Sequence, residues 1–269
     1  MKILAFWDLF GRIWRKWFQK ELPKLKEKYN PDFIIVNVEN IASWRWPISK
    51  LVVEMEELWV DVMTGWDHIY DNHKDIMPFL EKDDCSLLRP ANFYESDLFT
   101  TPGKWYKIVE KNGKKLLVIH LIWEVFTKFN IYNPFLKVDE ILKEVSGEKF
   151  DAVVVDFHKE VSSEGYWMGM FLDGRISLLF GTHTHVQSND EMILQKWTWF
   201  ISDAWMTGPL YSVIWADYGS VEKRFLSWIL KWKIDQDLWK DYVVSWVFAE
   251  INDYKCSQIE KIRIRGKLV

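Results

Sequence analysis

The chain has few cysteines, no long apolar run and little net charge. Its 269 residues include two cysteines, Cys85 and Cys256, so no disulfide framework is expected. No apolar run reaches the ~18–20 residues that a membrane-spanning helix requires. The apolar run after Lys2 is too short for a signal peptide, since Asp8 ends it. A net charge of −4 gives no general attraction to nucleic acid or to an anionic membrane. These absences predict a cytoplasmic protein without a membrane partner.

Glycine is also scarce, and tryptophan is abundant. The chain has 12 glycines, whereas a typical usage of about 7% would give roughly 19. It has 18 tryptophans. The remaining composition, with 49% hydrophobic and 28% charged residues, is typical of a soluble globular protein. The unusual feature of the composition is therefore confined to these two residue types.

Apolar runs and helical stretches alternate through the first part of the chain. Buried strands are predicted at residues 2–7, 33–36 and 60–63, with helices at 12–28 and 49–58 between them. This alternation is typical of βαβ units and a largely parallel sheet.

The second part of the chain predicts further strands and no repeat or linker. Two strand-like runs flank Asn112-Gly113, and Asn-Gly is the strongest short signal for a hairpin. Ser220 is expected to cap the last helix. Other elements are a helix from about 133 to 145, strands at 151–156 and 176–180, an extended stretch at 192–201, and an antiparallel pair at 242–251 and 259–265. A single domain over 1–269 is the simplest organisation, with 230–269 adding strands to it.

Two histidines follow a buried strand in the sequence Thr182-His183-Thr184-His185. Residues i and i+2 of an extended segment share a face, so both imidazoles can point at one object. An isolated pair of this kind would be explained as surface residues without a role. Other polar residues, however, follow other predicted strands, namely Asp8, Glu39, Asn40, Asp67, His68 and His158. Ligands bind at the carboxyl ends of strands in open α/β sheets.

Carboxylates, an amide and imidazoles together suit a pair of divalent transition-metal ions. No thiolate belongs to the set, which argues against a structural zinc site. Two ions ~3.5–4 Å apart can activate water and stabilise an in-line displacement at phosphorus. Each residue has a simpler explanation: Asp8 as a turn or cap, Glu39 and Asn40 as a solvated loop, His158 as a core histidine. Their coincidence at several strand ends favours the metal site. His73 and His120 lack this context and are assigned to surface and core.

The chain resembles the YmdB-like metallophosphoesterases of the calcineurin-like superfamily. The resemblance covers most of residues 1–225 in the family's order. The matching segments are 8–12 (DLFGR), 36–40 (VNVEN), 67–71 (DHIYD), 88–92 (LRPAN), 101–104 (TPGK), 155–158 (VDFH), 172–175 (LDGR), 181–187 (GTHTHVQ) and 206–209 (MTGP).

The resemblance implies a four-layer α/β/β/α sandwich with a di-metal site, most often iron or manganese. It implies hydrolysis of phosphodiesters, including 2′,3′- and 3′,5′-cyclic nucleotides. By position, one ion would be held by Asp8, Glu39, Asn40 and His185, and the other by Glu39, Asp67, His158 and His183. His68 would give a proton to the leaving oxygen, a task that suits an imidazole.

The chain departs from the family pattern in two ways. Asp67 stands where the family has asparagine. The aspartate can still bind a metal, but it adds negative charge where the phosphate approaches. Tryptophan also replaces glycine repeatedly, at positions 7, 14, 44, 46, 59, 66, 105, 123, 205 and 215. A tryptophan residue cannot take the backbone conformations with positive φ as readily as glycine does. We hypothesise that the gene uses UGA for glycine and that the written sequence translates it as tryptophan.

Two alternatives remain open at this stage. If the tryptophans are real, the chain can be a regulatory or scaffold member of the fold with little turnover. A related phosphomonoesterase or nuclease is the other alternative, although no strong basic stripe for long nucleic acid is present. A small phosphodiester is the expected partner. The metal, the natural substrate and a homo-oligomeric state are not determined by the sequence.

Overall fold

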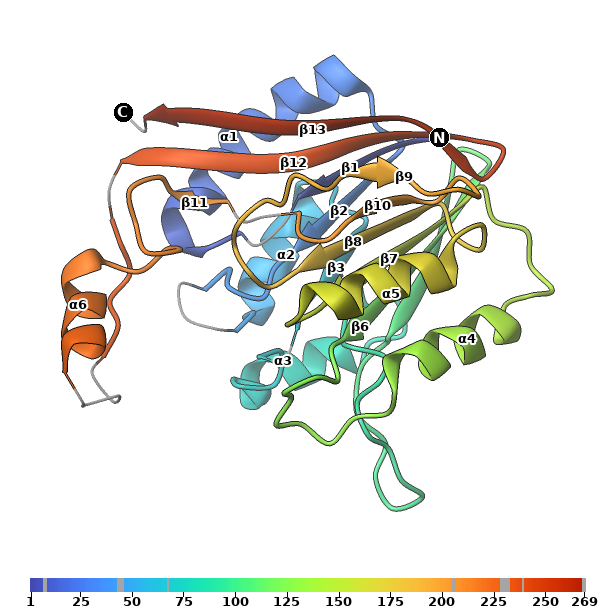
Figure 1. The fold of residues 1–269 in the computed structure, drawn as a ribbon, viewed down its shortest axis with the longest axis horizontal. Helices are drawn as coiled ribbons and strands as arrows, with labels where there is room; N and C mark the ends of the chain where they lie inside the picture. The colour runs from blue at the N-terminus through green and yellow to red at the C-terminus, as the bar shows by residue number, and fades with distance from the viewer. Residues whose placement is uncertain are drawn as a thin grey trace.

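A computed structural model describes residues 1–6, 9–42, 46–66, 68–204, 207–227, 233–238 and 240–267, with only the backbone at 12 and 13. The predictions for Asp8 and Asp67, and for Trp7, Trp44 and Trp205, lie outside these residues. The described part of the chain forms two β-sheets with helices outside them (Figure 1).

The first sheet is built around parallel strands from the first part of the chain. Its order is β11-β12-β1-β2-β3-β4, and β13 pairs with the other edge of β12. Strands β1 to β4 are parallel, whereas β12 runs antiparallel to β1. The strands are β1 (Lys2–Phe6), β2 (Phe33–Asn37), β3 (Val62–Thr64), β4 (Leu87–Leu88), β11 (Gly208–Pro209), β12 (Asp241–Asn252) and β13 (Lys255–Lys267). The two long strands of the tail therefore extend this sheet, as the antiparallel pattern predicted.

The second sheet contains the remaining strands in the order β5-β6-β7-β8-β10-β9. Its central strands β6, β7, β8 and β10 are parallel, and antiparallel strands form both edges. The strands are β5 (Tyr106–Lys111), β6 (Lys114–Ile122), β7 (Ala152–His158), β8 (Leu178–Thr182), β9 (Met192–Ile193) and β10 (Trp199–Ile201).

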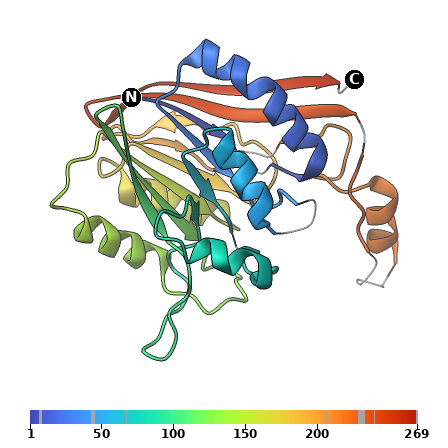
Figure 2. The same cartoon turned by 180° about the vertical axis from the view of Figure 1, so that it is seen from behind.

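The alternation of side chains along each strand creates the layers. In β1, Ile3 and Ala5 pack with residues of the second sheet, while Leu4 and Phe6 pack with helices. Helices α1 (Gly11–Tyr29), α2 (Ser49–Glu57) and α3 (His73–Leu80) cover the outer face of the first sheet. Helices α4 (Pro134–Glu144) and α5 (Ser162–Leu172) cover the second. Figures 1 and 2 show these layers from opposite sides and confirm the four-layer α/β/β/α sandwich.

Most predicted elements are present, with differences where local signals compete. The Asn112-Gly113 hairpin is confirmed, since both residues have the positive φ of its turn, 53° and 72°. Ser220 as the cap of α6 (Tyr218–Leu226) is wrong. Asp217 is the N-cap, and its carboxylate accepts the Ser220 N–H at 2.8 Å. Helix α3 was missed because it is short and contains Pro78. His120 is buried and His73 is exposed, as predicted.

None of the described helices is long and apolar enough to cross a membrane. The cytoplasmic location stays a prediction.

Candidate active site

Polar residues from both sheets meet at the carboxyl ends of the parallel strands. Glu39 and Asn40 follow β2, His68 follows β3, His158 ends β7, and His183 directly follows β8. A cavity of about 540 Å³ opens at this edge. Six of the eight predicted site residues line it: Glu39, Asn40, His68, His158, His183 and His185. The rest of the lining consists of Glu160, Thr184 and the apolar residues Trp66, Ile214 and Trp215. The other two predicted residues, Asp8 and Asp67, lie outside the described part of the chain.

Two imidazoles approach each other closely in this cavity. The distance from His158 Nε2 to His183 Nδ1 is 3.1 Å. Two nitrogen ligands of one ion at ~2.0–2.1 Å would themselves be about 3.0–3.4 Å apart. The pair thus has the spacing of two ligands that share one ion. On its other side, His183 Nε2 lies 2.6 Å from a Glu160 carboxylate oxygen.

The surroundings of His158 favour its neutral form. The side chain is fully buried, and burial lowers its pKa well below the ordinary value, with further lowering from His183 and other nearby histidines. A neutral imidazole is the form that binds a metal. Metal binding at this position therefore requires no proton to leave.

A chain of buried hydrogen bonds orients His158 from behind. Asn37 Nδ2 donates to Thr64 Oγ1 at 3.1 Å, and Thr64 donates to one Asp156 carboxylate oxygen at 2.6 Å. Thr182 donates to the other oxygen at 3.1 Å. The Thr182 oxygen, 3.1 Å from His158 Nδ1, is then left to accept the proton of that nitrogen. This arrangement directs the lone pair of Nε2 towards His183 and the cavity.

Asp156 lies at the centre of this chain and is completely buried. Burial raises its pKa to about 7, while the hydrogen bonds from Thr64 and Thr182 oppose that rise. The same carboxylate lies 3.6 Å from the Nδ1 of the buried His120, whose pKa burial lowers to about 3. The core behind the site therefore holds a carboxyl and an imidazole whose charged forms burial disfavours.

Glu39 faces the same cavity from the first sheet. Its side chain is 1% exposed, and one carboxylate oxygen accepts the backbone N–H of His68 at 3.0 Å. Asn40 beside it is 6% exposed. Because Glu39 comes from one sheet and His158 and His183 from the other, the cavity lies where the two sheets' strand ends meet.

Tryptophan side chains crowd the histidines. The Trp66 indole lies on the face of His158, with ring centroids 3.6 Å apart and an angle of 24°. The Trp123 ring lies 4.9 Å from His158 and 4.8 Å from His183. An imidazole binds a metal through a nitrogen in its ring plane, so stacking on its face does not block Nε2. The indole does form part of the cavity wall beside that ring.

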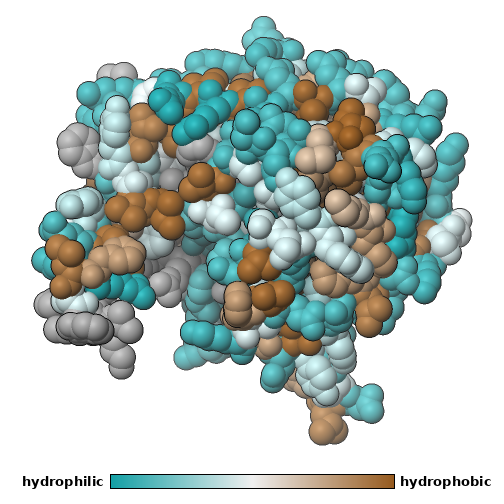
Figure 3. All heavy atoms as spheres, viewed as in Figure 1, coloured by the Kyte–Doolittle hydropathy of each residue, from teal (hydrophilic) through white to brown (hydrophobic). Residues whose placement is uncertain are grey.

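His68 connects the site to a second, more apolar pocket. His68 Nδ1 lies 2.7 Å from the Asp71 carboxylate, and Asp71 lines a neighbouring pocket of about 560 Å³. Aromatic side chains supply much of the wall of that pocket: Tyr70, Phe93, Tyr94, Phe99 and Phe129. The loop that carries Tyr94 and Phe99 projects from the body at the bottom of Figure 3 and ends in brown, apolar residues, with Leu98 97% exposed.

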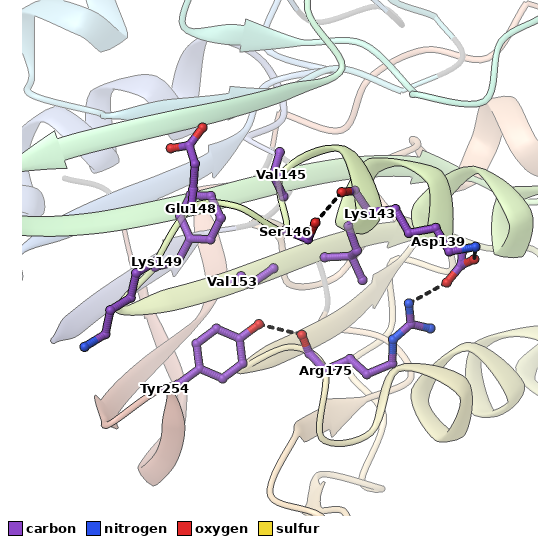
Figure 4. Close-up of a pocket in the computed structure, with 11 residues that line it drawn as sticks. Asp139, Lys143, Val145, Ser146, Glu148, Lys149, Val153, Arg175 and Tyr254 are labelled. Carbon is purple, nitrogen blue, oxygen red and sulfur yellow. Dashed lines mark hydrogen bonds and ion pairs between the residues drawn. The ribbon is translucent and has the colours of Figure 1, made fainter.

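Another cavity, of about 520 Å³, lies beside α4 at the opposite ends of β7 and β8 (Figure 4). Three of its charged groups pair with one another, since Asp139 contacts both Arg175 and Lys143 at 2.6 Å. The Tyr254 hydroxyl donates to the Arg175 carbonyl oxygen. Histidine is absent from its lining among the described residues. This cavity therefore lacks the chemistry of the carboxyl edge.

The donor set fits divalent transition-metal ions in its chemistry and in the spacing of one imidazole pair. Within the described residues, no group of three histidine, cysteine or acidic side chains gathers around a single point. Two predicted ligands, Asp8 and Asp67, are not among these residues. The assigned metal roles therefore stay predictions. The sequence-based prediction gave no role to four residues that contact the site: Asp71, Asp156, Glu160 and Thr182. Of these, Asp71 could have been found from the sequence, because it is an acidic residue three positions after His68.

Comparisons with known proteins find similar sequences and similar folds. A family model described as "YmdB-like protein" matches residues 4–262, beyond the segment on which the resemblance rested. A 2′,3′-cyclic-nucleotide 2′-phosphodiesterase of Bacillus subtilis (strain 168) is 39% identical over 225 residues, 84% of this chain and 82% of the relative. A solved structure of a hypothetical protein from Thermus thermophilus has a TM-score of 0.88 at 27% identity, covering 98% of this chain and 99% of that one. A novel phosphatase from Mycoplasma pneumoniae has a TM-score of 0.88 at 28% identity, covering 99% and 94%.

Proposed function

The chain belongs to the YmdB-like protein family, and from that premise we propose that it hydrolyses small phosphodiesters with two divalent metal ions, iron or manganese. The substrate class is cyclic nucleotides, as the name of the Bacillus relative suggests. The observation that carries the proposal is the meeting of Glu39, Asn40, His158, His183 and His185 in one cavity beside His68. That set joins hard oxygen and imidazole ligands to a proton donor.

Glu39, Asn40 and His185 would hold one ion, with Asp8, and Glu39, His158 and His183 would hold the other, with Asp67. When bound, the ions would neutralise the phosphoryl oxygens and activate a water molecule. Thr182 keeps the proton of His158 on Nδ1, so that Nε2 stays available as a ligand. Glu160 orients the His183 ring from its other nitrogen.

His68 would give a proton to the leaving oxygen. The Asp71 carboxylate, 2.7 Å from Nδ1, fixes the orientation of the ring. That interaction leaves Nε2 as the nitrogen that can carry a proton to a substrate. Cleavage of an ester bond requires this proton because the departing alkoxide is a strong base.

The aromatic pocket beside Asp71 would take the nucleobase. Its rings offer stacking surfaces, and stacking of a base on an aromatic side chain contributes about 1–3 kcal/mol. It adjoins the proton donor, so a base held there would place its own phosphate near His68. We expect Phe99→Ala to raise KM for 2′,3′-cyclic AMP and to leave KM for bis-p-nitrophenyl phosphate unchanged. Phe225→Ala, at an exposed ring on α6, is the matched control.

A direct assay tests the proposal. The protein supplied with Mn²⁺ or Fe²⁺ should hydrolyse bis-p-nitrophenyl phosphate and 2′,3′-cyclic AMP, and Glu39→Gln should abolish both activities. Glu110→Gln, an exposed carboxylate on β5, should retain them. Equal rates for wild type and Glu39→Gln would refute the assignment.

A regulatory or scaffold role without turnover is the second candidate, and the Trp66 indole over His158 favours it. That role predicts a stable, folded protein that hydrolyses none of the diesters tested, even with both ions bound.

A further inference from the structure

Among the described residues, three tryptophans have a positive φ: 66° at Trp59, 103° at Trp197 and 92° at Trp215. This backbone region crowds the Cβ atom of an L-residue against its own carbonyl oxygen, and bulky residues rarely occupy it. Glycine, which has no Cβ, is the usual residue there. Each of the three tryptophans also lies in a turn whose hydrogen bonds define a glycine position.

Trp59 follows the end of helix α2. Leu58 is the C-cap, the Trp59 N–H donates to Glu56 O at 2.8 Å, and the Val60 N–H donates to Met55 O at 3.1 Å. These two bonds form a Schellman motif, in which the residue directly after the C-cap is left-handed and is usually glycine. The Trp59 side chain is 71% exposed, so no packing compensates for the strain.

Trp197 lies in the loop that joins β9 to β10. The Leu194 N–H donates to Thr198 O at 2.8 Å, and the Trp197 N–H donates to Leu194 O at 3.0 Å. A three-residue hairpin loop of this kind is a type I turn followed by a left-handed residue that forms a G1 bulge. Trp197 occupies the left-handed position, which glycine normally fills.

Trp215 lies in a two-residue turn beside the candidate site. Val213 and Ala216 exchange backbone hydrogen bonds of 3.0 Å in both directions, and Ile214 between them also has a positive φ, of 46°. Positive φ at both central residues defines a type I′ turn, whose second central residue is most often glycine. Ile214 shares the unusual geometry, and the glycine assignment does not extend to it.

The indole N–H groups give an independent sign. Buried tryptophans normally donate this proton to an acceptor. Within the described residues, buried indole nitrogens without a hydrogen-bond partner occur at Trp14, Trp17, Trp105, Trp123, Trp197, Trp199 and Trp246. The chain also has 18 tryptophans against 12 glycines. These observations point to tryptophan at positions that did not evolve for an indole.

We infer that positions 59, 197 and 215 carry glycine in the natural protein, because UGA codons of its gene are read as glycine. The same change at position 66 removes the ring that lies 3.6 Å from the His158 ring. The space above that imidazole then becomes available to substrate. The identity of these residues does not depend on whether the protein hydrolyses phosphodiesters.

Peptide mass spectrometry of the protein purified from its natural source tests the inference directly. Peptides that span positions 59, 66, 197 and 215 should have the mass of glycine at each position, and the gene should have UGA codons there. Tryptophan in the peptides, or UGG codons at 59, 197 and 215, would overturn it.

Unfolding measurements test the same claim on recombinant protein. Trp59→Gly, Trp197→Gly and Trp215→Gly should each raise Tm, because they relieve a strained backbone. Trp167→Gly is the matched control, since Trp167 is half exposed in the regular helix α5, where glycine weakens a helix. It should lower Tm. A lower Tm for all four variants would contradict the glycine assignment.

Discussion

Thr64→Val tests whether the buried hydrogen-bond chain behind His158 supports the site. Thr64 accepts from Asn37 Nδ2 at 3.1 Å and donates to Asp156 at 2.6 Å, and its side chain is 1% exposed. Valine keeps the shape and removes both bonds, which leaves a buried amide and a buried carboxylate each short of a partner. Each such loss costs about 1–3 kcal/mol. We expect the free energy of unfolding to fall by about 3 kcal/mol and Tm by roughly 6–12 °C.

The same substitution should weaken metal binding, because Asp156 positions Thr182 and Thr182 positions His158. Loss of an outer partner of a metal ligand typically lowers metal affinity about 10–100-fold. Urea unfolding gives the stability, and titration with Mn²⁺ gives the affinity. Thr100→Val, on an exposed loop, is the matched control and should change neither. An unchanged Mn²⁺ affinity in a destabilised Thr64→Val protein would refute the view that this chain orients the site.

Three further predictions concern the fold. Gly113→Val should destabilise the protein by about 1–2 kcal/mol in urea unfolding, because Gly113 has φ 72° in the β5–β6 turn; no change would contradict the turn assignment. Asn133→Ala should cost about 1 kcal/mol, since the side chain caps α4 by accepting the N–H groups of Phe135 and Leu136; unaltered stability would contradict that cap. Burial alone would raise the pKa of Asp32, but the Lys114 ammonium 2.6 Å away and the Lys2 N–H outweigh it and lower the pKa. Asp32→Asn should therefore lose up to ~1 kcal/mol at neutral pH. That difference should shrink as the pH falls below the ordinary value of 3.8, since acid protonates the carboxylate in both states; a difference that persists at low pH would exclude the ion pair as its cause.

The strands at 2–6, 33–37, 62–64, 152–158 and 178–182 were predictable because each carries a continuous apolar run, whereas the two-residue strands β4 and β11 were not predicted. The closing pair β12 and β13 and the Asn112-Gly113 hairpin were predictable for the same kind of local reason. Helix α3 was not, because Pro78 interrupts a helix of only eight residues. The cap of α6 was misassigned because Asp217 and Ser220 both have side chains that can accept an N–H, and the choice between them depends on where the backbone turns.

The candidate site was predictable in part. Glu39, His158 and His183 arrive at one edge because each stands at or just after the carboxyl end of a predicted strand. The contacts of His183 with Glu160 and of His158 with Thr182 were not predictable, since they join residues of different strands and loops at distances that only the packing of the sheet determines. The aromatic pocket beside Asp71 likewise combines residues from α3 and from two distant loops.

The composition indicates that some tryptophans stand at unsuitable positions. Only the backbone conformation shows which tryptophans these are. The excess of tryptophan over glycine is visible in the sequence. The turns at Trp59, Trp197 and Trp215 become identifiable through their φ values and the hydrogen bonds around them.

The claim that the two sheets' strand ends form a two-ion centre is tested most directly by counting the metal. The protein is equilibrated with Mn²⁺, freed of excess ion by gel filtration, and analysed by inductively coupled plasma mass spectrometry beside Glu39→Gln and Glu110→Gln. A two-ion centre should give two ions per chain in the wild type and in Glu110→Gln, and fewer in Glu39→Gln, which removes the carboxylate that both ions would share. Equal metal content in the wild type and Glu39→Gln, or no bound metal in a folded wild type, would contradict it.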